Sequence, residues 1–262
     1  MLKGRTAIVT GANRGIGMAV VKVFAENHAN VWACARTPNS EFQNYIDNLA
    51  ETYEVNIKPV FFDLHEDASV KEKIKEIGKV SDSIDILVNN AGISIEKLFS
   101  MTSVDFIREA MNVNFVSQVL LSQLVSRYMI KQKSGSIINI ASVAGVEREQ
   151  GGLAYGSSKA SVIFSTKTMA LELGMYGIRV NCVSPGFINT DMWINRSDEL
   201  KNRILEETPL RRQGKPEEVA NTVLFLASDL SSFITGQNII VDGGRMGGVD
   251  KMKIKIVDSC GV

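Results

Sequence analysis

The chain has few of the residues that mark special classes of protein. Its 262 residues include 3 cysteines, 2 histidines and 5 prolines. Cys34, Cys182 and Cys260 are widely spaced and form no CxxC pair, which excludes a zinc ribbon or a thioredoxin-type redox motif. His28 and His65 belong to no metal-ligand spacing, so we expect no metal site. An odd set of cysteines, two of them in apolar runs, fits a reducing compartment, and we expect a cytoplasmic protein.

Net charge and long apolar runs are lacking too. The 29 Lys and Arg balance 29 Asp and Glu, which argues against nucleic acid or an anionic membrane as a partner. No run approaches the roughly 18 apolar residues of a membrane span, and glycine soon breaks the apolar start, unlike a signal peptide. With 45% hydrophobic and 22% charged residues, disorder is excluded. The length suits one large domain with a core that needs no disulfide.

Short β-branched runs alternate with segments of helical periodicity as far as about residue 241. We expect strands over 6–10, 31–35, 57–62, 84–88, 136–141, 178–184 and 238–241. We expect helices roughly over 15–28, 40–54, 67–79, 103–131, 153–176 and 216–228. Most strand runs are apolar without alternation, as in strands buried on both faces. The pattern predicts a single-domain α/β fold, a doubly wound (Rossmann) parallel sheet with helices on both faces.

Two segments interrupt this alternation. Residues 187–215 are long for a connection in a compact domain, and such loops are often functional lids. The tail 245–262 holds the run KMKIKIV, which is typical of an edge strand, although its flanking glycines equally favour an unstructured end. We therefore divide the chain into a domain, 1–244, and a tail of unknown role, 245–262.

A glycine-rich turn, TGANRGIG at residues 10–17, follows the first expected strand. Gly11 permits a tight turn, Gly15 lets the backbone approach a pyrophosphate, and Gly17 lets the next helix pack on the sheet. The N-terminus of that helix offers free N–H groups and a positive dipole end to phosphates. A glycine cluster alone fits any tight turn, but the place between the first strand and a helix is the one that a dinucleotide motif requires.

Two cations, and no carboxylate, lie where the adenosine ribose of a dinucleotide would bind. The second expected strand ends at Ala35-Arg36, where an NAD-binding site carries an acidic residue. A guanidinium pairs with the 2′-phosphate that a carboxylate would repel, and Arg14 adds a second positive charge. Two solvated surface arginines are the alternative. The pattern favours NADP(H).

Tyr155 and Lys159 are four residues apart at the start of an expected helix, so they share one face. The pKa of a tyrosine, about 10, must fall by about 3 for proton exchange near pH 7, and a nearby ammonium acts in that direction. Taken alone, the pair better fits an amphipathic helix with a half-buried Tyr and an exposed Lys. Ser142 ends the fifth expected strand, where a crevice forms in such sheets, and its hydroxyl can donate to a carbonyl oxygen that gains charge.

These motifs occur together with NNAG at residues 89–92, and the sequence resembles the short-chain dehydrogenase/reductase family over about residues 3–244. The resemblance implies that Asn114, in MNVNF, completes a catalytic tetrad with Ser142, Tyr155 and Lys159 by holding a water that relays protons to the lysine. Taken alone, an Asn inside a helix packs or faces solvent. The resemblance also implies that NADP(H) contacts Gly11, Asn13, Arg14, Gly15, Ile16, Gly17, Arg36, Asp63, Leu64, Asn90, Ala91, Gly92, Tyr155, Lys159, Pro185, Gly186, Ile188 and Thr190.

The resemblance implies a role for each of these groups. Asp63 would accept from the adenine amino group, although an Asp that merely turns the chain is as good a reading, and Ile188 and Thr190 would lie at the nicotinamide. In the reaction we expect, the cofactor supplies a hydride to a ketone. Tyr155 donates the proton, Ser142 polarises the carbonyl oxygen, and Lys159 lowers the tyrosine pKa and binds the nicotinamide ribose.

The C-terminal third, from FINTDM to VDGG, resembles bacterial 3-oxoacyl-(acyl carrier protein) reductases of fatty-acid synthesis. Sugar, polyol and steroid reductases share this pattern, so it indicates the substrate only weakly. One departure is Tyr176, at a position that is usually basic and thought to help dock the acidic carrier protein, although Lys133 keeps the other basic position. A second is Glu147-Arg148-Glu149, whose charges suit a polar or charged substrate or else form a solvated loop turned away from the site.

Three hypotheses follow. The first is an NADPH-dependent carbonyl reductase of 3-oxoacyl thioesters, with acyl carrier protein as a partner. The second is a sugar, polyol or keto-acid oxidoreductase of a specialised pathway. The third, a dinucleotide-binding regulator without chemistry, predicts a broken tetrad. The resemblance further implies a homotetramer built through the long helices around 103–131 and 153–176 and the last strand.

Overall fold

The computed structural model describes residues 1–194 and 196–246. Within these ranges seven parallel strands form one sheet, in the order β3-β2-β1-β4-β5-β6-β7. Their bounds are β1 Thr6–Thr10, β2 Asn30–Ala35, β3 Ile57–Phe61, β4 Ile86–Asn89, β5 Gly135–Ile140, β6 Ile178–Pro185 and β7 Asn238–Val241. The strand order reverses direction between β1 and β4, which confirms the predicted doubly wound sheet.

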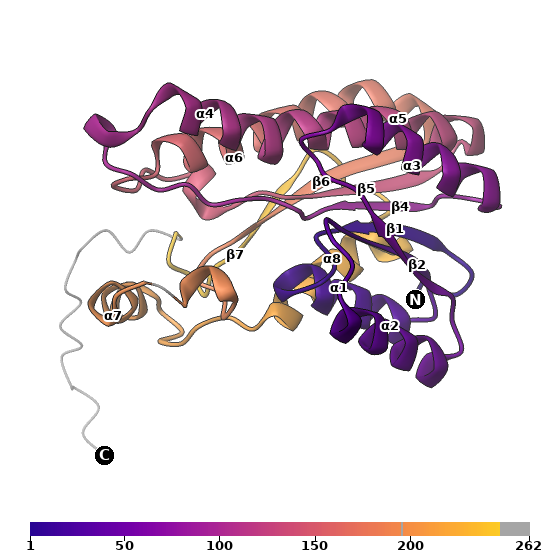
Figure 1. The fold of residues 1–262 in the computed structure, drawn as a ribbon, viewed down its shortest axis with the longest axis horizontal. Coiled ribbons are helices and arrows are strands. Elements are labelled where there is room, and N and C mark those ends of the chain that lie inside the picture. The colour runs from indigo at the N-terminus through magenta and orange to yellow at the C-terminus, as the bar shows by residue number, and fades with distance from the viewer. Residues whose placement is uncertain (195, 247–262) are drawn as a thin grey trace, which may run out of the picture.

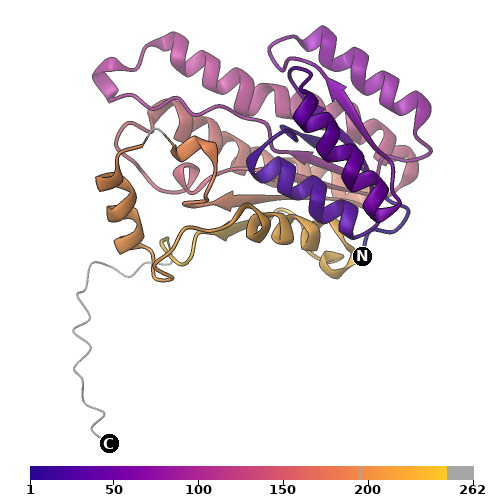
Figure 2. The same cartoon turned by 60° about the horizontal axis from the view of Figure 1, so that its bottom comes forward.

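Helices cover both faces of the sheet. Their bounds are α1 Gly15–Glu26, α2 Ser40–Tyr53, α3 Asp67–Val80, α4 Val104–Met111, α5 Ser117–Gln132, α6 Leu153–Leu173, α7 Asp198–Glu207 and α8 Pro216–Ala227. Figure 1 shows α1, α2 and α8 on one face and α3 to α6 on the other, whereas α7 stands apart from both layers, as it also does in Figure 2. No helix of the described residues is long and apolar enough to cross a membrane.

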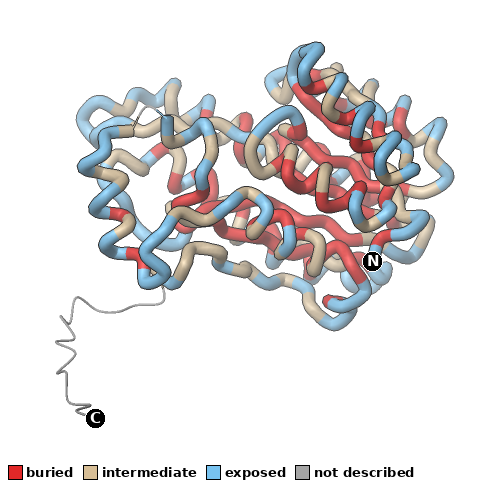
Figure 3. The backbone as a smooth tube through the Cα atoms, turned by 90° about the horizontal axis from the view of Figure 1, so that it is seen from below, coloured by how far each residue is buried: buried red, intermediate tan, exposed pale blue. Residues whose placement is uncertain are grey.

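The core lies between the sheet and its two helical layers (Figure 3). Because successive side chains of a strand point to opposite faces, Ala7 and Val9 of β1 pack toward α1, α2 and α8, whereas Ile8 packs toward α3 and α5. All four residues of β4 are buried. Burial on both faces explains why these runs are apolar without alternation.

Two helical segments differ from the sequence-based expectation. The helix expected over 103–131 is divided by a π-helix, Asn112–Val116, into α4 and α5. Residues 187–215, expected as a loop, contain α7, whose N-terminus is capped by the Ser197 hydroxyl. Ile204 is the buried residue of α7 and most of its other side chains are exposed, so the apolar periodicity that predicts a helix is weak there. The KMKIKIV run lies outside the described residues.

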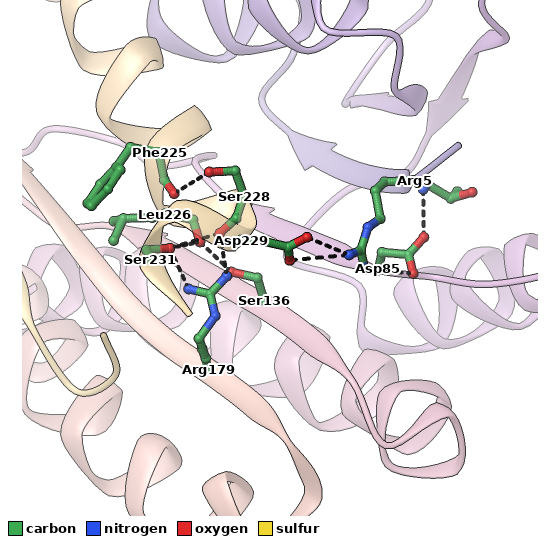
Figure 4. A network of polar contacts seen from close by, with 10 residues as sticks. Arg5, Asp85, Ser136, Arg179, Phe225, Leu226, Ser228, Asp229 and Ser231 are labelled. Atoms are coloured by element: carbon green, nitrogen blue, oxygen red, sulfur yellow. Dashed lines mark hydrogen bonds and ion pairs between the residues drawn. The ribbon is translucent and has the colours of Figure 1, made fainter. Parts of the chain in front are cut away.

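A polar network closes the amino ends of the strands (Figure 4). Asp85 accepts a 2.8 Å hydrogen bond from the backbone N–H of Thr6, and Arg5 lies 3.3 Å from a carboxylate oxygen of Asp229. The Arg179 guanidinium donates to the Ser231 hydroxyl over 2.8 Å. These contacts hold the segment after α8 against the start of the sheet. They lie at the opposite end of the strands from the cleft described next.

Candidate functional site

A cleft of about 880 Å³ runs along the carboxyl ends of the strands, where the strand order reverses. Such a reversal is where open α/β sheets bind ligands. Every residue predicted to contact the cofactor lines this cleft except Gly17. Ser142 also lines it, whereas Asn114 lies behind its wall. The structure therefore brings the predicted groups from seven separate stretches of sequence into one site.

The glycine-rich turn forms a cradle for an anion at one end of the cleft. Gly11 has a φ of +63°, and a Cβ there would lie 2.9 Å from Asn90 Nδ2 and 3.0 Å from Ala91 Cα. A Cβ on Gly17 would overlap the Gly11 carbonyl oxygen, so only glycine lets α1 approach the turn. The N-cap residue Arg14 makes no side-chain capping bond, which leaves the first N–H groups of α1 for a ligand. This cradle fits a pyrophosphate.

Asn90 and Thr10 fix the floor of the crevice. The Asn90 side chain donates to the carbonyl oxygens of Thr10 and Gly11 over 2.9 and 3.2 Å. In return, the Thr10 hydroxyl accepts from the backbone N–H groups of Asn90 and Ala91 over 3.0 and 3.1 Å. The ends of β1 and β4 are thereby joined beside the glycine turn, and the backbone at Ala91 is held where a ribose would lie.

Both predicted cations line the cleft. Arg36 follows the buried Ala35 at the end of β2, and Arg14 belongs to the glycine-rich turn. Arg14 is 3.9 Å from Asp191, but both side chains are exposed, and such a pair is weak enough to exchange for a phosphate. Hydrogen bonds from the backbone and ring of His65 hold the pKa of Asp63 below its ordinary value. Asp63 is thus an ionised acceptor at the edge of the adenosine end.

Ser142, Tyr155 and Lys159 meet in the middle of the cleft. Ser142 follows the end of β5, and the other two lie one turn apart near the start of α6. The Lys159 ammonium is 5.9 Å from the centre of the Tyr155 ring and donates a 2.8 Å hydrogen bond to the Ile140 carbonyl. Lys159 is 3% exposed. The predicted exposed lysine of an amphipathic helix is therefore excluded.

Burial dominates the acid–base properties of this pair. It raises the pKa of Tyr155 to about 12, against the lowering effect of a hydrogen bond with Ser142, while the Glu96 and Glu149 carboxylates raise it further. The direction predicted from the sequence, a lowered pKa of Tyr155, is wrong, because loss of solvent around the phenol outweighs the effect of the nearby ammonium. The Tyr155 phenol is protonated near pH 7, as a proton donor must be. Burial also lowers the pKa of Lys159 to about 8.

Asn114 is fully buried in the π-helix and acts on the backbone. Its Oδ1 accepts from the Ile93 N–H over 2.8 Å, and its Nδ2 donates to the Ile93 carbonyl and the Ser158 hydroxyl over 2.9 and 3.0 Å. The side chain therefore joins the loop after β4 to α6, which carries Tyr155. This gives Asn114 a positioning role, and its part in a proton relay stays a prediction.

Beyond Tyr155 the cleft is walled by charged side chains, of which only Glu149 was a candidate from the sequence. Arg196 lies 2.6 Å from Glu96, and Arg245 lies 3.0 Å from Glu149 and 3.2 Å from Glu207. These pairs join segments up to 100 residues apart, so no local pattern could have shown them. Among the described residues no three His, Cys, Asp or Glu side chains are grouped to hold a metal ion, and these carboxylates serve arginines instead.

The two departures from the reductase pattern, the charged stretch 147–149 and Tyr176, lie in different parts of the structure. Of the charged stretch 147–149, Glu149 lines the cleft, while Glu147 and Arg148 are exposed and do not. Lys133 and Tyr176 precede β5 and β6, at the amino end of the sheet. The 21 residues of α6 span about 30 Å, and this length separates Tyr176 from Tyr155.

Comparison with known proteins agrees with this site. Residues 11–245 match the family model of enoyl-(acyl carrier protein) reductase, in the short-chain dehydrogenase series. The chain is 42% identical over 243 residues to the 3-oxoacyl-[acyl-carrier-protein] reductase FabG of Aquifex aeolicus, covering 93% of this chain and 98% of that protein. It is 40% identical over 243 residues to the protein of the same name from Thermotoga maritima, again covering 93% and 98%.

Solved structures give the same result. The 3-oxoacyl-[acyl-carrier protein] reductase of Brucella melitensis matches with a TM-score of 0.86 at 32% identity, over 93% of this chain and 91% of that one. YwfH, an NADPH-dependent reductase involved in bacilysin biosynthesis, matches with a TM-score of 0.87 at 26% identity, over 94% and 99%. With the glycine turn, the Ser-Tyr-Lys group and the strand order in place, the chain belongs to the short-chain dehydrogenase/reductase family, oxidoreductases that act on carbonyl or alcohol groups with a nicotinamide dinucleotide.

Proposed function

We propose that this protein is an NADPH-dependent carbonyl reductase that acts on 3-oxoacyl thioesters. The observation that carries the proposal is the meeting of Ser142, Tyr155 and Lys159 in the cleft opened by the glycine-rich turn. The names of the relatives at about 40% identity support the thioester as substrate. A regulator without chemistry has no need of the complete tetrad, so the third hypothesis is not favoured.

The side chains of this site divide the chemistry between them. The cofactor supplies the hydride when bound. The Tyr155 phenol, protonated because of its burial, donates a proton to the carbonyl oxygen of the substrate. The Ser142 hydroxyl donates a hydrogen bond to the same oxygen as negative charge develops there. Lys159, with a pKa of about 8, gains and loses a proton near neutral pH and so returns one to the tyrosine.

Two arginines of the cleft support NADPH over NADH. Arg36 and Arg14 both line it, and the residue that ends β2 is Ala35 rather than an acid. A guanidinium forms charge-assisted hydrogen bonds with a phosphate. One structural neighbour is itself described as NADPH-dependent, which agrees with this choice.

The proposal that an acyl carrier protein carries the substrate rests on the names of the relatives and not on the geometry of the site. Lys133 lies against Gly177, just past the far end of α6, so a carrier protein held there would lie about 30 Å, the length of α6, from the Tyr155 of the same chain. The charged wall beyond Tyr155 favours the second candidate, a reductase of a polar ketone in a specialised pathway, with which the neighbour from bacilysin biosynthesis agrees. We place the fatty-acid reading first, on the names of the relatives.

We further propose that the domain of residues 1–244, together with Arg245 in the wall of its cleft, is catalytic and assembles as a homotetramer in the cytoplasm. Apolar side chains on and near α6 support assembly, because Phe164, Leu171 and Phe233 are 74%, 83% and 103% exposed. Light scattering should give about four times the chain mass of 28.7 kDa. A monomer in solution at micromolar concentration would contradict this assembly.

The test of the function is the oxidation of NADPH and NADH in the presence of acetoacetyl-CoA. We expect turnover with NADPH and much slower turnover with NADH. Tyr155→Phe is the control variant, because it removes the proton donor and leaves the cofactor end of the cleft unchanged. Tight NADPH binding without turnover of any 3-oxoacyl thioester would overturn the thioester proposal and favour the polar ketone.

A further inference from the structure

The substrate half of the cleft is bounded by two ion pairs. The part of the cleft from Arg36 to Pro185-Gly186 is predicted to hold the cofactor. The space that remains beyond Tyr155 is lined by Ser94, Glu96, Glu149, Met192, Trp193, Arg196 and Arg245. Both substituents of a ketone whose oxygen meets Tyr155 and Ser142 must lie in this space, and so must face these side chains.

Arg245 is the centre of the deeper ion pair. Its side chain is 16% exposed, and it bonds two carboxylates that come from different segments. Nη1 donates to Glu149, in the loop before α6, over 3.0 Å, and Nε and Nη2 donate to Glu207, at the end of α7, over 3.3 and 3.2 Å. Burial lowers the pKa of Arg245, but the bonds to these carboxylates outweigh that effect and leave it raised. The guanidinium therefore stays charged in the wall of the cleft.

The second pair closes the other side. Arg196, between the Trp193 segment and α7, lies 2.6 Å from Glu96, and both side chains are 28% exposed. The aromatic ring of Trp193 packs edge-on against Phe187 with centroids 4.4 Å apart, so a small apolar surface lies near the reacting centre. The two pairs that line the cleft are balanced in charge, and Arg245 also binds Glu207, which lies outside the lining, so neither guanidinium is left without a carboxylate.

We infer that Arg245 and Arg196, with the carboxylates they pair with, are specificity determinants that make the site select short ketones carrying an uncharged hydrogen-bonding group. The inference deepens the proposed function and rests on it. A long alkyl chain would cover ion-paired groups that are now partly hydrated, and it would find only the small apolar surface at Trp193 in return. A free carboxylate would lose its hydration and find both guanidiniums already paired. A thioester, an ester or an amide carries polar atoms without charge and suits this wall.

The dependence of Kd on the length of the substrate's alkyl chain distinguishes this charged wall from an apolar substrate tunnel. Burial of a methylene in apolar surroundings improves affinity by about 0.8 kcal/mol, or about fourfold. Four added methylenes in a tunnel would therefore tighten binding by roughly 200-fold. In the charged space we expect the eight-carbon substrate to bind no more tightly than the four-carbon one.

The experiment measures binding apart from turnover. Calorimetry gives the Kd of ethyl 3-oxobutanoate, ethyl 3-oxooctanoate and free 3-oxobutanoate to the complex of the protein with NADP⁺, in which a ketone cannot be reduced. Reduction of the corresponding thioesters by NADPH is followed separately. We expect nearly equal Kd values for the two esters, and a Kd at least about tenfold higher for the free acid, which loses hydration without gaining a partner.

The double variant Glu149→Gln/Arg245→Met removes the deeper pair without leaving a lone charge in the cleft, because Glu207 is 46% exposed and stays hydrated. It should improve the binding of the eight-carbon ester relative to the four-carbon ester by about tenfold or more, since several methylenes gain an apolar neighbour. Lys73→Met/Glu76→Gln is the matched control. It removes a 2.8 Å ion pair on α3 and should leave the ratio unchanged.

The outcomes are distinct. A wild-type Kd that falls about fourfold per methylene, or a double variant with an unchanged ratio, overturns the inference. If the double variant does not fold, the wild-type series and the free-acid comparison still decide between the charged wall and a tunnel. Failure to reduce any thioester, with the ester series as expected, overturns the proposed substrate but not the selectivity of the wall.

Discussion

Lys159→Met should change how the stability of the protein depends on pH. Burial lowers the pKa of Lys159 from its ordinary 10.5 to about 8. In the unfolded chain the lysine keeps its ordinary pKa, so between these two values the unfolded state binds more protons than the folded state. Folding is therefore penalised by the buried ammonium below pH 8, and the penalty disappears as the pH rises through 10.5.

The size of the effect follows from the two pKa values. At pH 7 the penalty is about 3 kcal/mol, and at pH 10 it is below about 1 kcal/mol. The wild-type free energy of unfolding should therefore gain about 2.5 kcal/mol between pH 7 and pH 10 from this group alone. Methionine has a similar length and does not titrate, so the variant lacks this gain. At pH 7 relief of the penalty outweighs the lost hydrogen bond to Ile140, about 1 kcal/mol, so the variant should fold.

Urea unfolding of both proteins at pH 7 and pH 10 measures the difference. Packing changes and the lost hydrogen bond are nearly independent of pH, and other titrating groups are common to both chains. All of them cancel when the pH 7 to pH 10 change of the variant is subtracted from that of the wild type. A remainder of about 2.5 kcal/mol supports the argument. Equal changes in the two proteins would refute it, because Lys159 would then titrate alike folded and unfolded.

Three other predictions concern separate parts of the molecule. Tyr155→Phe should lower kcat on the order of a hundredfold to ten-thousandfold and leave the NADPH Kd, measured by fluorescence titration, unchanged; surviving activity would exclude Tyr155 as the proton donor. Arg36→Asp should shift the kcat/KM ratio of NADPH to NADH tenfold to about a hundredfold toward NADH, and an unchanged ratio would contradict the assigned phosphate contact. Asp85→Ala leaves the Thr6 N–H without its acceptor and should lower the free energy of unfolding, measured in urea, by about 1–3 kcal/mol while KM stays unchanged. Asp85→Asn keeps an acceptor oxygen, so its free energy of unfolding should fall by less.

The fold could be predicted because each of its signals is local. The β-branched runs of the strands and the glycine turn at residues 10–17 depend on neighbours in the sequence, and both were placed correctly. The π-helix Asn112–Val116 could not be predicted from local sequence, and the partners of its Asn114, Ile93 and Ser158, are 21 and 44 residues away. The helix α7 was missed because most of its surface faces solvent, which removes the apolar periodicity.

For the site, the sequence predicts which residues take part but not their surroundings. The identity of Ser142, Tyr155 and Lys159 follows from motifs, and the structure brings them together. The direction of the Tyr155 pKa does not follow, because the spacing of two residues says nothing of how much solvent the fold removes. The wall formed by Arg196 and Arg245 could not be predicted from the sequence for a similar reason, since each arginine meets its carboxylate only through the tertiary fold.

The position of Arg245 decides where a shortened version of the protein can end. It is the first residue after the domain boundary that the sequence suggests at 244, yet its side chain forms part of the substrate space. A gene ended after Gly244 would encode the glycine turn and the whole tetrad but lack one wall of the cleft, and Glu149 and Glu207 would lose their shared partner. A gene ended after Met246 is the matched comparison, because it keeps that wall. For this protein, the last motif of the sequence ends before the active site does.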